Sequence, residues 1–260
     1  MAGNPAHVKR LLETKQCQGG DLRDANLCRF NLSGADLSGA KLMFSNLNNA
    51  KLSKANLSGA DLSFANLVAA DLTSADLSGL DAKGINLFEC NLNNANLSGA
   101  DLRVGNLVNA SLSNANLSGA DLAGANAIGS NMTMANLSGA NLGGANLGKA
   151  NLVAANLQNA NLSEARLVDA DLSDANLSGA NLSSANLLNV NLSGANLSGA
   201  NLNGANLAHA KLEGAIGIYP EEHVMARQNP PSSSGMPSSG MSYLPHSESG
   251  SSNSPRLGLP

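Results

Sequence analysis

The sequence predicts an all-β solenoid whose chain completes a four-sided coil every twenty residues. One observation is the block Asn-Leu-Ser-Gly-Ala, which keeps a single register of twenty at 56–60, 96–100, 116–120, 136–140, 176–180 and 196–200. Another is a shorter period of five: of the 39 positions taken in steps of five from Leu22 to Leu212, 36 are Leu. A period of five fits neither the spacing of a helix nor the alternation of an open strand. It fits a chain that turns a corner every five residues.

The corners and the sides of each coil have different residue requirements. The position two residues before each of these 39 central positions is Ala in 30 cases, so we expect Ala inside the corners and Leu pointing inward from the sides. Such repeats bury a core only by stacking on their neighbours. In Leu-Ser-Gly-Ala the Gly takes the third turn position, where a type II turn needs positive φ. We expect type II turns on that side, and type I or irregular turns where Phe, Val, Lys or Glu replaces the Gly.

The tandem Ala-Asn/Asp-Leu-Xaa-Xaa units resemble the pentapeptide repeat proteins over about residues 20–215. The resemblance implies a right-handed, four-sided parallel β-helix and no catalytic residues. The lead-in Leu-Leu-Glu-Thr-Lys-Gln-Cys at 11–17 is similar to the entry segment of cyanobacterial members. Some of those carry a second Cys just before the first repeat, where Gly19 and Gly20 stand here.

Four segments are expected along the chain: a lead-in with a capping helix at 1–19, the β-helix at 20–215, a C-terminal cap at 216–227, and a disordered tail at 228–260. A helix is expected over 4–16, with Asn4 as N-cap and Pro5 at its first position. Val8, Leu11 and Leu12 would form its apolar face. A lid is needed because an open coil end exposes core Leu and unpaired edges. The tail is rich in Ser, Gly and Pro and cannot repay the entropy of ordering.

Two local features depart from the regular repeat, one around Ala82 and one after the last coil. Around Ala82 the central Leu is lost while Leu80, Ile85 and Cys90 enlarge the corners, which indicates repacking at conserved volume with a local distortion of the coil. Ile216, Ile218 and Tyr219 are expected to cover the last coil.

Composition excludes several classes of function. Residues 20–215 hold 15 acids and 10 bases, too few bases for a nucleic-acid binder. No run of 18 apolar residues predicts a membrane span, and no apolar N-terminal region predicts a signal peptide. Cys17, Cys28 and Cys90 form neither a disulfide framework nor a metal spacing, which favours a reduced cytoplasmic setting. The four His residues lie in no catalytic motif, so we expect no enzyme, metal or cofactor.

An apolar column is the candidate interface. Its position is outward, yet the equivalent columns on two other sides carry mostly Ser or Thr. Its apolar members are Val68, Phe88, Val108, Ile128, Val168 and Leu188. The neighbouring side adds Met43, Phe44, Phe64 and Val104. Monomers rarely keep such a strip in water, so we expect it to dock an unidentified protein or a second copy. The alternative is that β-branched residues simply suit strands.

Two polar columns accompany it. Asp61, Asp81, Asp101 and Asp121 follow Asp21 and Lys41 in steps of twenty, with Lys83 and Arg103 close by. A metal site is one interpretation of these carboxylates, and a self-compensated wet face is the favoured one. Asn residues run in steps of twenty from Asn26 to Asn146, and stacked Asn side chains can hydrogen-bond along the rod.

The favoured function is a non-enzymatic protein-binding scaffold on a rigid rod. The alternative is a DNA mimic that modulates DNA gyrase or another DNA-binding protein, which the family resemblance suggests. An excess of five acids over about ten coils imitates the charge density of DNA only weakly.

Overall fold

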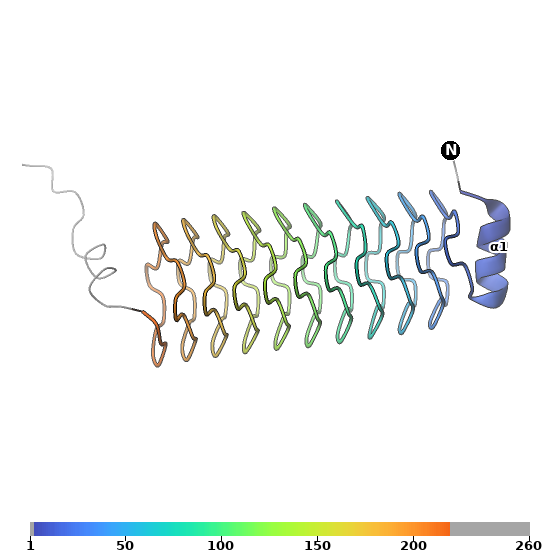
Figure 1. Ribbon diagram of the computed structural model, residues 1–260. Helices are drawn as coiled ribbons and strands as arrows, with labels where there is room; N and C mark the ends of the chain where they lie inside the picture. The colour runs from blue at the N-terminus through green and yellow to red at the C-terminus, as the bar shows by residue number, and fades with distance from the viewer. Residues whose placement is uncertain (1–2, 219–260) are drawn as a thin grey trace, which may run out of the picture. The chain divides into compact units, whose positions relative to one another are not determined.

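The computed structural model describes residues 3–218, which form one helix and a rod of stacked coils (Figure 1). The helix, α1, spans Pro5–Thr14. In the rod, each coil carries four bridge residues, and each pairs in parallel with the residue twenty positions on, from Gln16↔Asp36 to Asn196↔Ile216. The bridges are isolated, so each side is one short extended step and the described residues contain no longer strand. This register confirms the coil of twenty with four sides; its right-handed sense stays a prediction.

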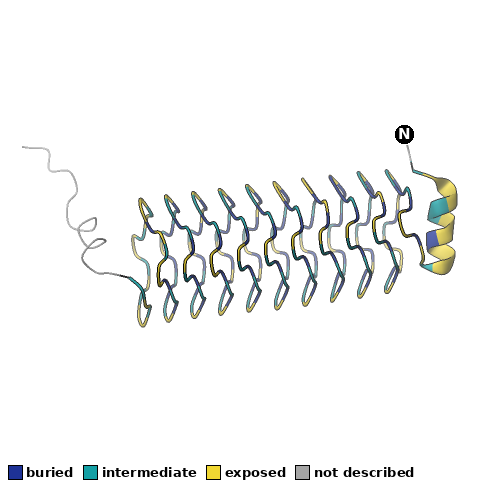
Figure 2. Ribbon diagram, in the orientation of Figure 1, coloured by how far each residue is buried: buried dark blue, intermediate teal, exposed yellow. Residues whose placement is uncertain are grey.

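The core runs along the rod axis. Every central residue from Leu22 to Leu202 is buried, including Ala82, Ala127 and Met132. Buried and exposed residues alternate around every coil (Figure 2). The predicted assignment of inward and outward positions is therefore confirmed.

In the unit 116–120, each of the five backbone N–H groups has a hydrogen-bond acceptor. Two N–H groups donate to the next coil, one donates to the preceding coil, and one closes the corner. The fifth donates to the side chain at the first position of its own unit, an Asx turn. The distances are 2.7 Å from Leu117 N to Asn136 O, 2.9 Å from Gly119 N to Ser138 O, 2.9 Å from Asn116 N to Ala95 O, 3.0 Å from Ala120 N to Leu117 O, and 3.2 Å from Ser118 N to Asn116 Oδ1.

The expectation for the turns is wrong on three of the four sides. Every fifth residue from Asp24 to Gly214 has positive φ, whether or not it is Gly. Phe44, Phe64 and Val104 have φ values of 56°, 57° and 51°. An L-residue in this region costs about 1–2 kcal/mol. The cause is the stacking, because the N–H of this residue must reach a carbonyl of the next coil, as Phe64 N reaches Lys83 O at 3.0 Å.

The coil around Ala82 buries its substituted residues as predicted, but the expected distortion is wrong, because Ala82 N still bonds to Asp101 O at 2.8 Å and Gly84 N to Arg103 O at 2.9 Å. Leu80, Ala82 and Ile85 are all buried. Gly105 lies beneath Ile85, and a Cβ added at Gly105 would lie 3.4 Å from Ile85 Cγ2. Because Gly105 has no side chain, it leaves room for the large corner residue Ile85 of the preceding coil. Cys90 is also buried, and burial raises the pKa of its thiol to about 12.

Helix α1 ends earlier than the sequence suggested. Asn4 Oδ1 accepts a hydrogen bond from Ala6 N at 2.9 Å, as an N-cap does. Lys15 has φ 57° and its N–H bonds to Leu11 O at 2.8 Å, which ends the helix at Thr14. Leu11 is buried in the shared core, but Leu12 is exposed and is no part of the apolar face. The capping role of α1 stays a prediction.

At the other end of the rod, Ile216 is 56% exposed and pairs with Asn196 instead of covering the last coil. Ile218 is partly buried against the core. The expected cap at 216–227 lies mostly outside the described residues, and the expected tail at 228–260 lies wholly outside them.

Replacing Leu117 by Asn should destabilise the protein far more than replacing Ser118 by Asn. Leu117 is fully buried, so the change removes about 2–5 kcal/mol of packing and buries an amide without partners. Ser118 is only partly buried. Thermal melts monitored by circular dichroism measure the difference. Equal melting temperatures would contradict the inward position of Leu117.

Candidate interaction surface

The predicted apolar column is less exposed than its sequence suggested. Its six members, Val68, Phe88, Val108, Ile128, Val168 and Leu188, are all partly buried. None belongs to the most exposed apolar side chains of the described residues. The column therefore offers less apolar surface to a partner than expected.

The more exposed apolar surface lies at the corner of the adjacent side. Phe44, Phe64 and Val104 have exposed fractions of 57%, 50% and 58%. The rings of Phe44 and Phe64 stack with centroids 5.5 Å apart and planes 11° apart. The Phe64 ring also lies over Gly84, because a Cβ there would come within 2.7 Å of Phe64 Cδ1. We call Phe44, Phe64, Gly84 and Val104 the aromatic ridge. Met43, the remaining candidate on this side, is partly buried.

The ridge combines exposed apolar surface with backbone strain. A β-branched residue with positive φ is an outlier, and Val104 is one with φ 51°. Residues held in such conformations often mark functional sites. Gly124, Gly144 and Gly204 occupy the same position in later coils, so the fold itself accepts Gly there.

Replacing Val104 by Gly should raise the melting temperature slightly. The change relieves about 1–2 kcal/mol of left-handed strain and adds about 0.5–1 kcal/mol of backbone entropy cost, while an exposed side chain contributes little packing. Calorimetry of the two proteins measures the shift. A clear loss of stability would show that Val104 packs on the coil more than its exposure implies.

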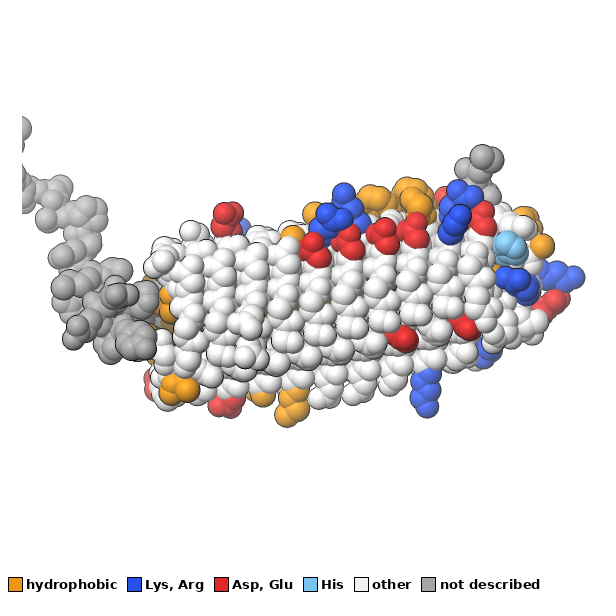
Figure 3. All heavy atoms as spheres, viewed as in Figure 1, with side chains coloured by type: hydrophobic (Ala, Val, Ile, Leu, Met, Phe, Trp, Pro, Cys, Tyr) orange, Lys and Arg blue, Asp and Glu red, His pale blue; other side chains and the backbone are white. Residues whose placement is uncertain are grey.

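An acidic row runs beside the ridge, on the same side of the coil. It consists of Asp61, Asp81, Asp101 and Asp121. Figure 3 shows acidic side chains aligned along the rod, with hydrophobic side chains gathered next to them. Coil stacking places successive carboxylates about 4.8 Å apart, so their charges repel unless bases intervene.

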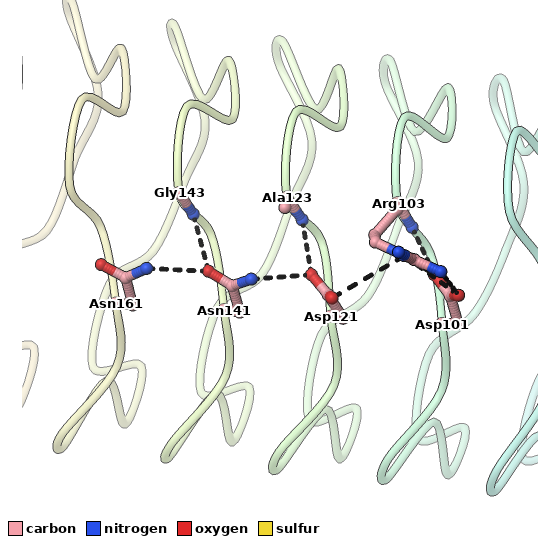
Figure 4. Close-up of polar contacts among 7 residues, drawn as sticks. All are labelled: Asp101, Arg103, Asp121, Ala123, Asn141, Gly143 and Asn161. Carbon is pink, nitrogen blue, oxygen red and sulfur yellow. Dashed lines mark hydrogen bonds and ion pairs between the residues drawn. The ribbon is translucent and has the colours of Figure 1, made fainter.

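Arg103 compensates one end of the acidic row (Figure 4). Its Nε lies 2.9 Å from Asp101 Oδ1 and 3.8 Å from Asp121 Oδ2. The hydrogen bond from Arg103 lowers the pKa of Asp101. Beyond Asp121 the charges end, and Asn141 Nδ2 donates to Asp121 Oδ1 at 2.9 Å.

The other end of the row is compensated less, although the charge of Arg103 still acts on Asp81. Asp61 Oδ1 accepts from Ser63 N at 3.0 Å, and Asp81 Oδ1 accepts from Ser63 Oγ at 3.0 Å. Within residues 3–218, neither Asp61 nor Asp81 forms an ion pair. Asp61 lies in the coil of Phe64, and Asp81 lies in the coil of Gly84.

The amide ladder predicted from Asn26 onward forms at some of its steps, for example from Asn106 Nδ2 to Asn86 Oδ1 at 3.0 Å. Sequence analysis missed that similar ladders run on two other sides, as from Asn136 Nδ2 to Asn116 Oδ1 at 3.1 Å. The signal was present as Asn repeated every twenty residues there too. Because the ladders recur on several sides, they support the rod and mark no particular site.

Neither a metal centre nor a membrane-crossing helix is found in the part of the chain that the structure describes. No three His, Cys, Asp or Glu side chains there are grouped to hold an ion. Helix α1, with its ten residues, falls short of what a bilayer requires.

Replacing Arg23 by Gln should lower the melting temperature at neutral pH and have no effect in strong acid. A hydrogen bond from Arg23 lowers the pKa of Asp21 from 3.8 to about 2. A lowered folded-state pKa stabilises the fold above the unfolded pKa, and this contribution is lost as pH falls from 3.8 toward about 2. Thermal melts of both proteins across this pH range measure the contribution of the Asp21–Arg23 interaction to stability. A difference between the two proteins that persists unchanged at the acid end would contradict this role of Asp21.

Comparisons with known proteins agree with this architecture. The family model of pentapeptide repeats matches in eight copies, over residues 21–59, 40–79, 55–94, 65–103, 106–144, 135–174 and 175–214. A search of curated proteins gives no significant match.

Among solved structures, the chain is similar to HetL of the cyanobacterium Nostoc sp. strain PCC 7120, described as involved in heterocyst differentiation regulation. The identity is 35%, over 83% of this chain and 97% of HetL, with a TM-score of 0.59. A pentapeptide repeat protein of the Arabidopsis thaliana thylakoid lumen is 36% identical over 36% of this chain and 66% of its own, with a TM-score of 0.36. QnrB1, a plasmid-mediated fluoroquinolone resistance protein, is 22% identical over 78% of this chain and 94% of its own, with a TM-score of 0.48. The family match and the similarity to HetL show that this chain belongs to the pentapeptide repeat family.

Proposed function

We propose that this protein is a non-enzymatic scaffold that binds another protein chain through apolar surface on a rigid rod. The observation that carries the proposal is the aromatic ridge. Two stacked Phe rings and a Val stand exposed at turn positions where Gly would relieve strain. Neither solubility nor folding benefits from that choice, whereas binding does, because exposed apolar patches commonly mark interaction sites.

The frame beneath the ridge suits such a role. Each turn is held by hydrogen bonds to the neighbouring coils, so the ridge is fixed before a partner arrives. A preorganised surface loses less entropy on binding than a flexible one. The partly buried apolar column would extend the contact on the adjacent side.

Two further points belong to this proposal. HetL is described as taking part in regulation, and a regulatory binding role fits a rod without catalytic groups.

We propose a cytoplasmic location, which the three free cysteines support. The DNA-mimic alternative has less support, because Arg103 compensates part of the acidic row.

Replacing both Phe44 and Phe64 by Ser should abolish capture of protein partners without unfolding the rod. Ser184 already occupies the same turn position with φ 57°, so Ser fits the backbone. Affinity capture from the native cell, compared between the wild type and this variant, is the measurement.

Two matched variants complete that experiment. Met134 is 62% exposed at an equivalent turn on another side, so Met134→Ser should keep the captured proteins. The pair Phe88→Ser and Ile128→Ser tests the apolar column separately. A ridge variant that folds and still captures every partner would contradict the proposal. Loss of partner capture in the column variant alone would show that the interface lies on the apolar column instead.

A further inference from the structure

The sequence contains a single Asn-Gly step, Asn203-Gly204, and it lies in the last coil of the rod, which is orange in Figure 1. Both residues are exposed, and Gly204 takes the corner position with φ 71°. Gly has no Cβ, so its backbone nitrogen can approach the side-chain amide of a preceding Asn without steric hindrance. The step therefore has the composition of a site where Asn loses its amide.

The corner N–H of this step differs from those of the earlier coils on the same side. In earlier coils it donates to a carbonyl of the next coil, as Gly144 N donates to Ser163 O at 2.8 Å and Ser184 N donates to Asn203 O at 2.8 Å. Within residues 3–218 no further coil follows Gly204, and its N–H has no acceptor there. The Asn203 side chain also forms no hydrogen bond in that part of the chain, since only its main chain pairs.

An unbonded Gly nitrogen can act as a nucleophile toward the Asn amide. The Gly204 nitrogen loses its proton and bonds to Asn203 Cγ, while the bond from Cγ to Nδ2 breaks and ammonia leaves. The product is a cyclic succinimide. Water then opens the ring at either carbonyl, which leaves aspartate or isoaspartate at position 203. The net reaction consumes water and releases ammonia, without oxidation or reduction.

We propose that Asn203 is a site of spontaneous deamidation, and that stacking of the coils confines this reaction to the end of the rod. Where a further coil follows, the corner N–H is held by its carbonyl, and attack requires this bond to break and the corner to turn. Gly204 has no such bond to lose. The inference goes beyond the proposed function, because it uses no residue of the aromatic ridge.

The two products should affect the last coil differently. Aspartate keeps the main chain and adds one negative charge. Isoaspartate passes the main chain through the former side chain, so it displaces Asn203 O, which accepts the hydrogen bond from Ser184 N. Because each repeat of a solenoid contacts only its neighbours, we expect loosening of the last coil and no change in the middle of the rod.

Ageing of the full chain at mildly alkaline pH, followed by peptide mass spectrometry, tests the proposal. Asn203 should gain the mass that distinguishes a carboxyl from an amide, and fragmentation of the peptide locates the change. The rate should rise with pH, because the attacking nitrogen must lose its proton. Isoaspartate should accompany aspartate, since it forms through the succinimide and direct hydrolysis of the amide cannot produce it.

Ala123→Asn supplies the matched control within the same molecule. It creates a second Asn-Gly step eighty residues earlier, on the same side, where Gly124 N donates to Gly143 O at 2.9 Å. The introduced Asn should lose its amide at least about tenfold more slowly than Asn203, because the Gly124 hydrogen bond and the stacked corner add to the barrier. An introduced Asn that reacts as fast as Asn203, or an Asn203 as stable as the introduced one, overturns the proposal.

Two further variants keep the test decisive. If the Ala123→Asn protein fails to melt cooperatively, Ser118→Asn replaces it, since Gly119 N donates to Ser138 O at 2.9 Å and should protect the new step equally.

Gly204→Ala keeps Asn203 and places a methyl group beside the attacking nitrogen. Ala69 and Ala154 have φ values of 54° and 55° at equivalent corners, so Ala fits this backbone. The change should slow the reaction of Asn203. An unchanged rate, or a product that contains aspartate alone, would show that the Gly204 nitrogen is not the nucleophile and would overturn the assignment.

Discussion

The structure depends on one recurring interaction, the hydrogen bond from the backbone N–H of a central residue to the carbonyl nineteen positions on, in the next coil. In the middle of the rod it joins Leu117 N to Asn136 O at 2.7 Å. This bond forms only when coils stack in register, and stacking also buries the central Leu residues. Burial and backbone pairing therefore require the same twenty-residue repeat, which accounts for the strictness of the sequence pattern.

The same interaction sets the conformation of the turns. Each corner must aim a second N–H at the next coil, so positive φ is imposed at every corner regardless of the residue there. Gly meets this demand without strain, and Phe64 or Val104 meets it at a cost that stacking offsets. Outward positions are consequently free to vary in chemistry while the frame stays constant. Outward side chains can therefore form a binding surface such as the aromatic ridge without altering the backbone of the coil.

Sequence reasoning reached the coil, the core and the repacking around Ala82, because each follows from side-chain size at a fixed period. It failed on the turns, because the preference of Phe44 or Val104 for negative φ is a local property that the stacked coils override. It also centred the interface on the apolar column that contains Phe88 and Ile128. A period identifies outward positions, but it does not reveal that these side chains are half-buried while Phe44 and Phe64 stand clear of the coil.

The central claim is that each coil pairs with the next at a spacing of twenty residues. Scalar couplings transmitted through hydrogen bonds, measured by NMR, test it most directly. The account predicts a coupling from the amide nitrogen of Leu117 to the carbonyl carbon of Asn136, with the same offset at the central residues of all four sides. Couplings from these central amides to carbonyls at any other offset, or the expected couplings on some sides only, would contradict the coil and every surface derived from it.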